Sequence, residues 1–191
     1  MADESRWLIV GLGNPGAEYE QTRHNAGFFV ADLLADRMGC RFKAHKSRAL
    51  VAEGRLAGLP AVIAKPQSYM NDSGGPISAV AQFFKVPPAQ MVAIHDELDL
   101  DFGQLRVKLG GGDNGHNGLK SMRTSLGTGE FYRARFGIGR PPGRMAPADF
   151  VLKAFSAGER KELPLLVDRC ADAVEALLRD GLTAAQNDFN N

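Results

Sequence analysis

Six short polar side chains occupy positions where predicted strands end or where glycine-containing loops begin. They are Asn14, His24, Asn71, Asp96, His116 and Asn117. A histidine can act as a general base, a carboxylate can orient it, and amide groups can donate hydrogen bonds to a developing oxyanion. The sequence offers no activated nucleophile, because it has neither a G-x-S-x-G turn nor a cysteine suited to catalysis. The predicted chemistry is therefore attack of water on a carbonyl, with His24 or His116 as the base.

Structural roles compete with catalytic ones at these positions. Asparagine is common in turns and caps, so any single asparagine is more often structural than catalytic. His95 precedes Asp96 on a predicted strand and must point to the opposite face, so we assign it a structural role. His45 lies in the basic run from Arg37 to Arg48 and is predicted to be a solvated surface residue. The acidic run from His95 to Asp101 fits neither an HExxH nor an EF-hand pattern, so we predict no metal.

The sequence GLGNPG at residues 11–16 has the spelling of a dinucleotide-binding turn. That motif needs its third glycine at the start of a helix and an acidic residue about 20 positions later, at the end of a second strand. Here a proline precedes the third glycine, and Asp32 and Asp36 fall in a predicted helix instead. A dinucleotide-dependent oxidoreductase is therefore disfavoured, and we predict no cofactor. A plain glycine–proline turn is the simpler alternative, although it leaves Asn14 without a role.

A glycine-rich loop from Lys108 to Gly118 stands ahead of a predicted helix. Backbone N–H groups in such a loop can bind an anion such as a phosphate, although the loop could also be merely flexible. The spacing does not fit GxxxxGK[ST], so a nucleoside triphosphate is not indicated. Between Gln104 and Arg144 the chain has eight basic and two acidic residues, a local net charge of +6. This segment is where we expect an anionic partner to bind.

The elements that must position these groups alternate between short strands and amphipathic helices. Strands are predicted at 7–10, 49–56, 61–64, 91–96, 104–109 and 133–138, and helices at 26–38, 76–84, 119–126 and 157–180. Ser156 and Glu159 form a capping box for the last helix, in which Pro164 is predicted to cause a kink or a restart. This order predicts an α/β fold: a single three-layer domain over residues 1–191, with a twisted, mostly parallel or mixed sheet flanked by helices.

The composition is that of an ordinary globular protein. The 191 residues include 23 Lys+Arg and 22 Asp+Glu, so the net charge of +1 alone argues against a nucleic-acid partner. The charge is segregated, however, and the +6 segment reverses that inference. Cys40 and Cys170 are far apart and outside any CxxC, which favours a reducing cytoplasm over a disulfide framework. No signal peptide and no run of about 18 apolar residues is found, so we predict no membrane contact.

Six blocks between residues 11 and 141 together carry a specific resemblance. The blocks are GLGNPG followed by Tyr19, TRHNAGF at 22–28, KPQSYMNDSG at 65–74, HDELDL at 95–100, KLGGGDNGHNGLKS at 108–121 and FGIGRP at 136–141. In this order they resemble the successive motifs of the bacterial-type peptidyl-tRNA hydrolase family. The resemblance implies a monomeric cytoplasmic α/β enzyme that uses neither metal nor cofactor. Its partner is peptidyl-tRNA, and it cleaves the ester between the peptide and the terminal ribose.

The resemblance also implies a role for individual residues. His24 is the general base that activates water, Asp96 holds its ring, and Asn14 helps to distinguish N-blocked peptidyl from free aminoacyl substrates. The substrate and tRNA contacts implied are Tyr19, Tyr69, Met70, Asn71, Lys108, His116, Asn117 and Arg135. Among these, Lys108 and Arg135 clamp a tRNA phosphate with His116 adjacent, Met70 packs against His24, and the two tyrosines line the cleft.

This chain departs from the family pattern at a few positions. Asp113 and Asn114 stand inside the glycine loop, and Arg106 and Arg140 stand where lysine and histidine are common. These changes bear on affinity and substrate preference rather than on the reaction. The alternative function is a non-catalytic RNA-binding protein on the same fold. Such a protein would be expected to lose part of the catalytic set, which is intact here.

Overall fold

The computed structural model describes residues 5–190, in which seven strands form one sheet in the order β2-β3-β4-β1-β5-β7-β6. The four central strands run parallel: β4 (Leu59–Pro66), β1 (Trp7–Gly11), β5 (Met91–Glu97) and β7 (Tyr132–Gly137). The edge strands are antiparallel to their neighbours: β2 (Lys43–His45), β3 (Ala49–Leu56) and β6 (Leu105–Leu109). The predicted α/β class with a mixed sheet is confirmed.

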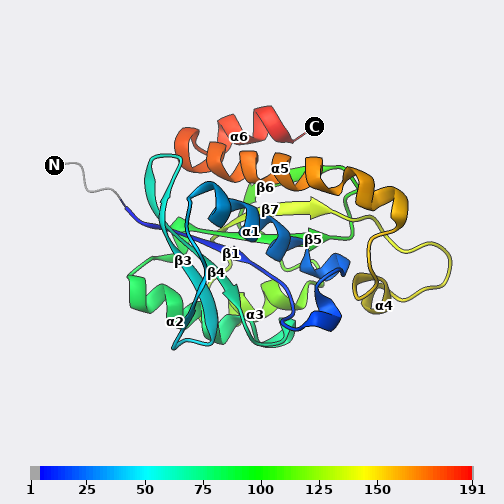
Figure 1. The fold of residues 1–191 in the computed structure, drawn as a ribbon, viewed down its shortest axis with the longest axis horizontal. Helices are drawn as coiled ribbons and strands as arrows, with labels where there is room; N and C mark the ends of the chain where they lie inside the picture. Colours follow the sequence, from blue (N-terminus) through cyan, green and yellow to red (C-terminus); the bar gives the residue numbers. More distant parts are fainter. Residues whose placement is uncertain (1–4, 191) are drawn as a thin grey trace.

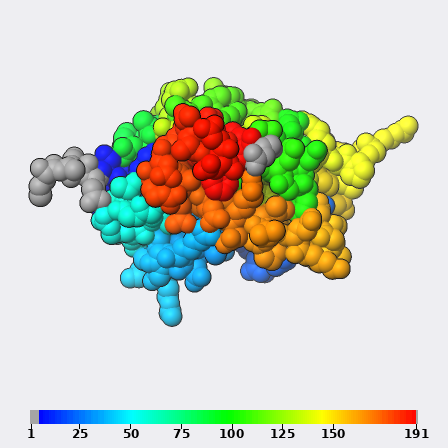
Figure 2. All heavy atoms as spheres, turned by 90° about the horizontal axis from the view of Figure 1, so that it is seen from above, coloured from blue at the N-terminus to red at the C-terminus, as the bar shows by residue number. Residues whose placement is uncertain are grey.

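Helices cover both faces of this sheet (Figure 1). One face carries α1 (Ala26–Arg37), α5 (Ala157–Asp180) and α6 (Leu182–Phe189), and the other carries α2 (Gly74–Phe84) and α3 (Asn117–Leu126). The short helix α4 (Pro147–Val151) follows a loop that projects from the body of the protein (Figure 2). Within the described residues, no helix is both long enough and apolar enough to cross a membrane.

The burial of the central strands explains their sequences. Along β1, Leu8 and Val10 pack into the core beside α2 and α3, whereas Ile9 packs into the core beside α1 and α5. All seven residues of β5 are buried. A strand covered on both faces is apolar at successive positions instead of alternating, which is why 7–10 and 91–94 are continuous apolar runs.

Two parts of the sequence-based prediction differ from the structure. The last long helix does not restart: α5 runs uninterrupted from Ala157 to Asp180 with Pro164 inside it. Proline removes one backbone donor to the carbonyl four residues earlier, but the buried stripe that includes Val167, Cys170 and Val174 holds the helix on the sheet. The strand β2 and the helices α4 and α6 were not predicted, because each is short.

The position of the site follows from two glycines. Strands β1 and β5 are parallel neighbours with Gly11 opposite Ile94, so both release their following residues at the same edge of the sheet. A Cβ on Gly27 would lie 2.3 Å from the Ile94 carbonyl oxygen, and one on Gly11 would lie 2.4 Å from the Gly27 carbonyl oxygen. Only glycine permits this approach of α1 to the strands. It places His24, three residues before Gly27, at the end of β5.

Candidate active site

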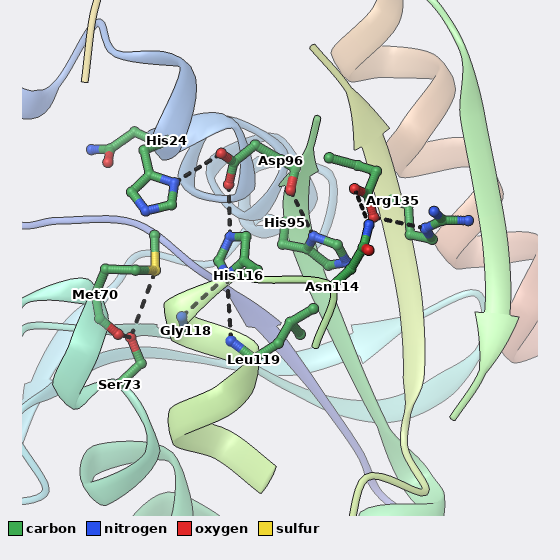
Figure 3. A network of polar contacts seen from close by, with 12 residues as sticks. His24, Met70, Ser73, His95, Asp96, Asn114, His116, Gly118, Leu119 and Arg135 are labelled. Atoms are coloured by element: carbon green, nitrogen blue, oxygen red, sulfur yellow. Dashed lines mark hydrogen bonds and ion pairs between the residues drawn. The ribbon is translucent and has the colours of Figure 1, made fainter. Parts of the chain in front are cut away.

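His24 and Asp96 are joined by a short hydrogen bond at the carboxyl end of β5 (Figure 3). His24 lies in the 3-10 turn Arg23–Asn25, and its Nδ1 is 2.8 Å from Oδ2 of Asp96. Asp96 is 3% exposed. An ionised carboxylate can only accept, so Nδ1 carries the proton, and in the neutral ring Nε2 has a free lone pair. The pair thus presents a base of defined orientation.

His116 supplies the second donor to the same carboxylate. Its Nε2 lies 2.8 Å from Oδ1 of Asp96, while its Nδ1 accepts the backbone N–H groups of Gly118 and Leu119 at the start of α3. Because Nδ1 accepts two hydrogen bonds, it carries no proton, and the proton of the neutral ring is on Nε2. His116 is therefore both the N-cap of α3 and a fixed donor to Asp96.

The surroundings shift the titration of both members of the His24–Asp96 pair. Burial disfavours the charged form of His24, but the charge of Asp96 and its hydrogen bond outweigh burial and raise the pKa of His24 above 6.5. Burial would raise the pKa of Asp96, but the charges and ring N–H donors of His24 and His116 hold that pKa well below its usual range. Asp96 therefore remains ionised at neutral pH.

His24, Asp96 and His116 also form a group whose ligand atoms are close enough to hold a metal ion. A metal ligand must offer an unprotonated nitrogen. For His116 that would move the proton from Nε2 to Nδ1, where the N–H groups of Gly118 and Leu119 point at the ring. The donor set fits a chain of hydrogen bonds better than it fits a metal.

His116 has two roles that substitution can separate. Asparagine can also cap a helix, but its shorter side chain cannot reach Asp96. We expect His116→Asn to retain most of the stability and to lower kcat/KM roughly tenfold, about the value of one hydrogen bond to a charged group. His116→Ala should lose a similar amount of activity and a further ~1 kcal/mol of stability through the missing cap. Thermal unfolding measures the effect on stability, and steady-state kinetics measure the effect on activity. Full activity in His116→Asn would show that the hydrogen bond from His116 to Asp96 does not contribute to activity.

The His24–Asp96 pair opens into a cleft with two adjoining compartments of about 280 and 270 Å³. His24 and Asn117 line both compartments. Asp96 and His116 line the first, and Asn14 and Asn71 line the second. All six polar residues singled out from the sequence therefore line one cleft.

The amide of Asn14 is held in one orientation. Its Oδ1 accepts the backbone N–H of Met70 at 2.7 Å, its backbone N–H donates to Oδ1 of Asn25 at 2.8 Å, and its carbonyl accepts from Nδ2 of Asn25 at 2.9 Å. Since the Met70 N–H identifies the oxygen, the other end of the amide is the NH₂ donor. Sequence reasoning missed Asn25, because its position beside His24 gives no sign that it fixes Asn14.

Aromatic and thioether groups complete the second compartment. Tyr19 and Tyr69 meet edge to face with ring centroids 6.3 Å apart, and Tyr69 is 60% exposed. Met70 is buried, and Figure 3 shows its thioether directed toward the His24 ring, as the family resemblance implies. These rings provide apolar surface on which a base or a peptide side chain can rest.

The arginine before His24 is a second residue that sequence reasoning missed. Arg23 is buried, donates to the carbonyl of Phe150, pairs with Glu159 at 3.0 Å, and lies over the Phe150 ring at 3.9 Å. It therefore ties the turn that carries His24 to α4 and to the start of α5. Only the contacts of the folded chain show this, since Phe150 and Glu159 are far away in sequence.

The acidic run after β5 pairs with the basic segment instead of with a metal. Glu97 bonds Arg135 at 3.0 Å, Asp99 bonds Arg140 at 2.7 Å, and Asn114 bridges the two carboxylates through its Nδ2. The local charge of +6 is thus partly neutralised in space. Asn114 fastens the glycine loop to the strand end, which gives this departure from the family pattern a structural role.

Other basic residues divide between structure and surface. Arg133 is fully buried and donates to the carbonyls of Gly111, Gly112 and Gly129, which shapes the glycine loop. The side chain of Lys108 makes no hydrogen bond or ion pair within residues 5–190. Partial burial and the nearby Arg135 and Arg133 guanidinium groups lower its pKa. An anion beside Lys108 would relieve this repulsion.

The remaining histidines and the basic run can now be placed. His95 is buried, donates from Nδ1 to the Asp96 carbonyl, and has a pKa lowered to about 3, mainly by burial and further by the neighbouring His116 and Arg133 side chains. This neutral ring has the structural role predicted for it. His45 is not a solvated surface residue: it is half-buried, because its ring packs on Phe83 and Phe84.

The dinucleotide interpretation of residues 11–16 fails in the structure. Gly16 has φ +112° in a turn, and the first α-helix begins only at Ala26, after two 3-10 turns. Within residues 5–190, therefore, no α-helix begins directly behind the glycine turn to receive a pyrophosphate. In the basic run, Arg37 is held by the carboxylates of Asp168, Asp172 and Glu175, and its role is to join α1 to α5.

An α/β fold with a histidine–carboxylate pair at a strand end and amide donors around it fits the class of hydrolases. Comparison with known proteins gives the family. The family model for peptidyl-tRNA hydrolase matches residues 8–191. The peptidyl-tRNA hydrolase of Frankia alni is 60% identical over 188 residues, covering 98% of this chain and 95% of the relative. That of Streptomyces coelicolor is 61% identical over 191 residues, covering 97% and 95%.

Solved structures agree with the sequence comparison. The crystal structure of peptidyl-tRNA hydrolase from Acinetobacter baumannii superposes with a TM-score of 0.91 at 36% identity, covering 98% of this chain and 95% of that one. The chain belongs to the peptidyl-tRNA hydrolase family. The family, the fold class and the enzyme class expected from the sequence are thereby confirmed.

Proposed function

We propose that this chain hydrolyses the ester between the peptide and tRNA in peptidyl-tRNA, with water activated by His24 and without a covalent intermediate. The observation that carries the proposal is the 2.8 Å hydrogen bond between Nδ1 of His24 and Asp96, inside a cleft lined by Asn14, Asn71 and Asn117. Family membership supports the substrate. A monomeric state, a cytoplasmic location and the absence of a metal and of a cofactor stay predictions.

The mechanism assigns each group one task. Nε2 of His24 removes a proton from a water molecule as its oxygen attacks the ester carbonyl. Asp96 stabilises the imidazolium that forms and keeps the required tautomer. The amide NH₂ of Asn14, with those of Asn71 and Asn117, donates to the carbonyl oxygen or to the peptide backbone as negative charge develops. The proton then passes from His24 to the departing ribose oxygen.

The tRNA backbone would be bound by basic residues of this region that have no ion pair among the described residues, and Lys108 is one of them. We assign Lys108 as the main phosphate contact, with Arg135 beside it. Arg135 is partly neutralised by Glu97, so it would contribute less than the count of basic residues suggests. Such contacts position RNA without reading its sequence, which suits an enzyme that must accept many tRNAs.

The direct test compares two substrates that differ only at the amino group. Purified protein should release N-acetyl-phenylalanine from N-acetyl-phenylalanyl-tRNA and leave phenylalanyl-tRNA intact, with the same rate in the presence of a zinc chelator. Hydrolysis of both substrates would contradict the assigned specificity. Tight binding of both tRNAs without hydrolysis would favour the non-catalytic RNA-binding alternative.

The raised pKa of His24 predicts opposite trends for activity and stability with pH. The base must be neutral, so kcat/KM for N-acetyl-phenylalanyl-tRNA should rise with pH through a midpoint above 6.5 and then level off. The charged His24–Asp96 pair stabilises the fold fully below 6.5, the unfolded value, and this contribution disappears as pH rises through the folded pKa. A pH–rate profile measures the first trend and thermal unfolding the second. A midpoint below 6.5 would contradict the assignment.

A further inference from the structure

A second cavity of about 400 Å³ lies beside the catalytic cleft. It is larger than either compartment of that cleft. Its walls come from the loop after β1, from α1, and from the ends of β3 and β4 that lie beside it. The size falls in the range of ligand-binding pockets. None of the roles assigned above uses this space.

Asn14 is the wall between the two spaces, since it lines both the cavity and the second compartment of the cleft. The contacts with Asn25 and Met70 described above fix this wall. The turn that follows continues the division: Tyr19 faces the cleft, whereas Glu20 and Gln21 line the cavity. The cleft and this cavity therefore meet at Asn14.

The charges around the cavity favour a cation. Lys65 is neutralised: its Nζ pairs with Oδ1 of Asp32 at 2.5 Å, and it lies over the rings of Phe28 and Phe42. Glu20 is exposed and has no ion pair within residues 5–190. One uncompensated carboxylate therefore faces a space with no free basic side chain. A phosphate would be repelled there, and an ammonium group would be attracted.

We propose that this cavity binds the N-terminal part of the peptide carried by tRNA. In this arrangement the Glu20 carboxylate faces the free α-ammonium group of the peptide. The assignment rests on the proposed function. The residue esterified to tRNA occupies the catalytic cleft, and the residues before it pass Asn14 in extended form. Gln21 and Gln67 can pair with peptide groups, and Phe28 supplies an apolar floor. The enzyme would then favour peptides over single N-blocked residues.

Three substrates test the assignment. N-acetyl-phenylalanyl-tRNA is too short to enter the cavity, alanyl-alanyl-alanyl-phenylalanyl-tRNA enters with its ammonium group, and the N-acetylated form of that tetrapeptide enters without charge. For the wild-type enzyme we expect kcat/KM to be highest for the tetrapeptide with the free ammonium group. Hydrolysis of the shortest substrate tests the proposed function separately, so the two hypotheses fail in different ways.

Two variants and one matched control locate the effect. Glu20→Lys should lower kcat/KM about fivefold or more for the charged tetrapeptide, as expected for reversing one surface charge contact, and leave N-acetyl-phenylalanyl-tRNA unchanged. Glu18→Lys, on the same turn but outside the cavity, should leave kcat/KM unchanged for both of these substrates. Gln21→Trp should narrow the cavity and raise KM for the two tetrapeptide substrates, but not for N-acetyl-phenylalanyl-tRNA.

The activity on the shortest substrate also reports whether each variant is folded. If Glu20→Lys and Gln21→Trp change kcat/KM equally for all three substrates, or change it for none of them, the cavity does not bind the peptide and the proposal is wrong. If Glu20→Lys instead strengthens inhibition by deacylated tRNA, the cavity faces RNA, which also overturns the proposal.

Discussion

His24→Ala should lower kcat/KM for N-acetyl-phenylalanyl-tRNA by about 10² to 10⁴-fold, the usual contribution of a positioned general base. The loss should appear in kcat, because His24 acts on water and binds little of the substrate. The dissociation constant for the same tRNA, measured with the inactive variant, should stay close to the wild-type KM if chemistry limits turnover. Single-turnover kinetics separate the two quantities.

The control for this substitution is His45→Ala. His45 is another partly buried histidine in contact with aromatic rings, but it lies on β2, outside the cleft. It should retain full activity and lose only some stability. Turnover near the wild-type rate in His24→Ala would show that His24 is not the base and that another group in the cleft activates the water.

Much of the fold follows from local sequence patterns. Continuous apolar runs predict the central strands, Ser156 and Glu159 predict the start of α5 through a capping box that the structure contains, and Gly39 ends α1 with φ +68°. The edge strand β2 escapes prediction because it is short and mostly exposed, and the helix α6 because it packs on β6, which is distant in sequence. Pro164 is a further case in which local sequence is insufficient, since tertiary packing keeps α5 continuous through a residue that usually breaks helices.

For the candidate site, too, some features could be predicted from the sequence and others could not. Residue types and strand ends predict that His24, Asp96 and the asparagines meet, because parallel strands release their polar ends at one edge. The sequence does not show how they are held. Asn25 fixes Asn14, and Arg23 anchors the turn that carries His24, through contacts that span up to 136 positions. His116 was assigned to substrate binding, and the structure adds the contact with Asp96 that no spacing rule predicts.

Asp96→Asn should lower kcat/KM by about 10⁴-fold, the size of effect seen when an amide imposes the wrong histidine tautomer in a serine protease. The contacts here determine the tautomer. His116 can offer only its Nε2 proton, because Gly118 and Leu119 N–H groups occupy its Nδ1. The introduced amide must therefore turn its oxygen to His116 and its NH₂ to Nδ1 of His24. That forces the His24 proton onto Nε2 and removes the lone pair that the reaction needs.

Asp96→Ala provides the contrast, because it removes the carboxylate without imposing a tautomer on His24. Its neutral ring can then exchange between both tautomers, so Asp96→Ala should be less stable than Asp96→Asn and yet more active. Nitrogen chemical shifts of the His24 ring distinguish the tautomers directly, and kcat/KM and thermal unfolding give the rank order. If Asp96→Asn is the more active variant, His116 does not hold the amide in one orientation. The carboxylate would then matter through its charge alone, and the N-cap of α3 would have no part in catalysis.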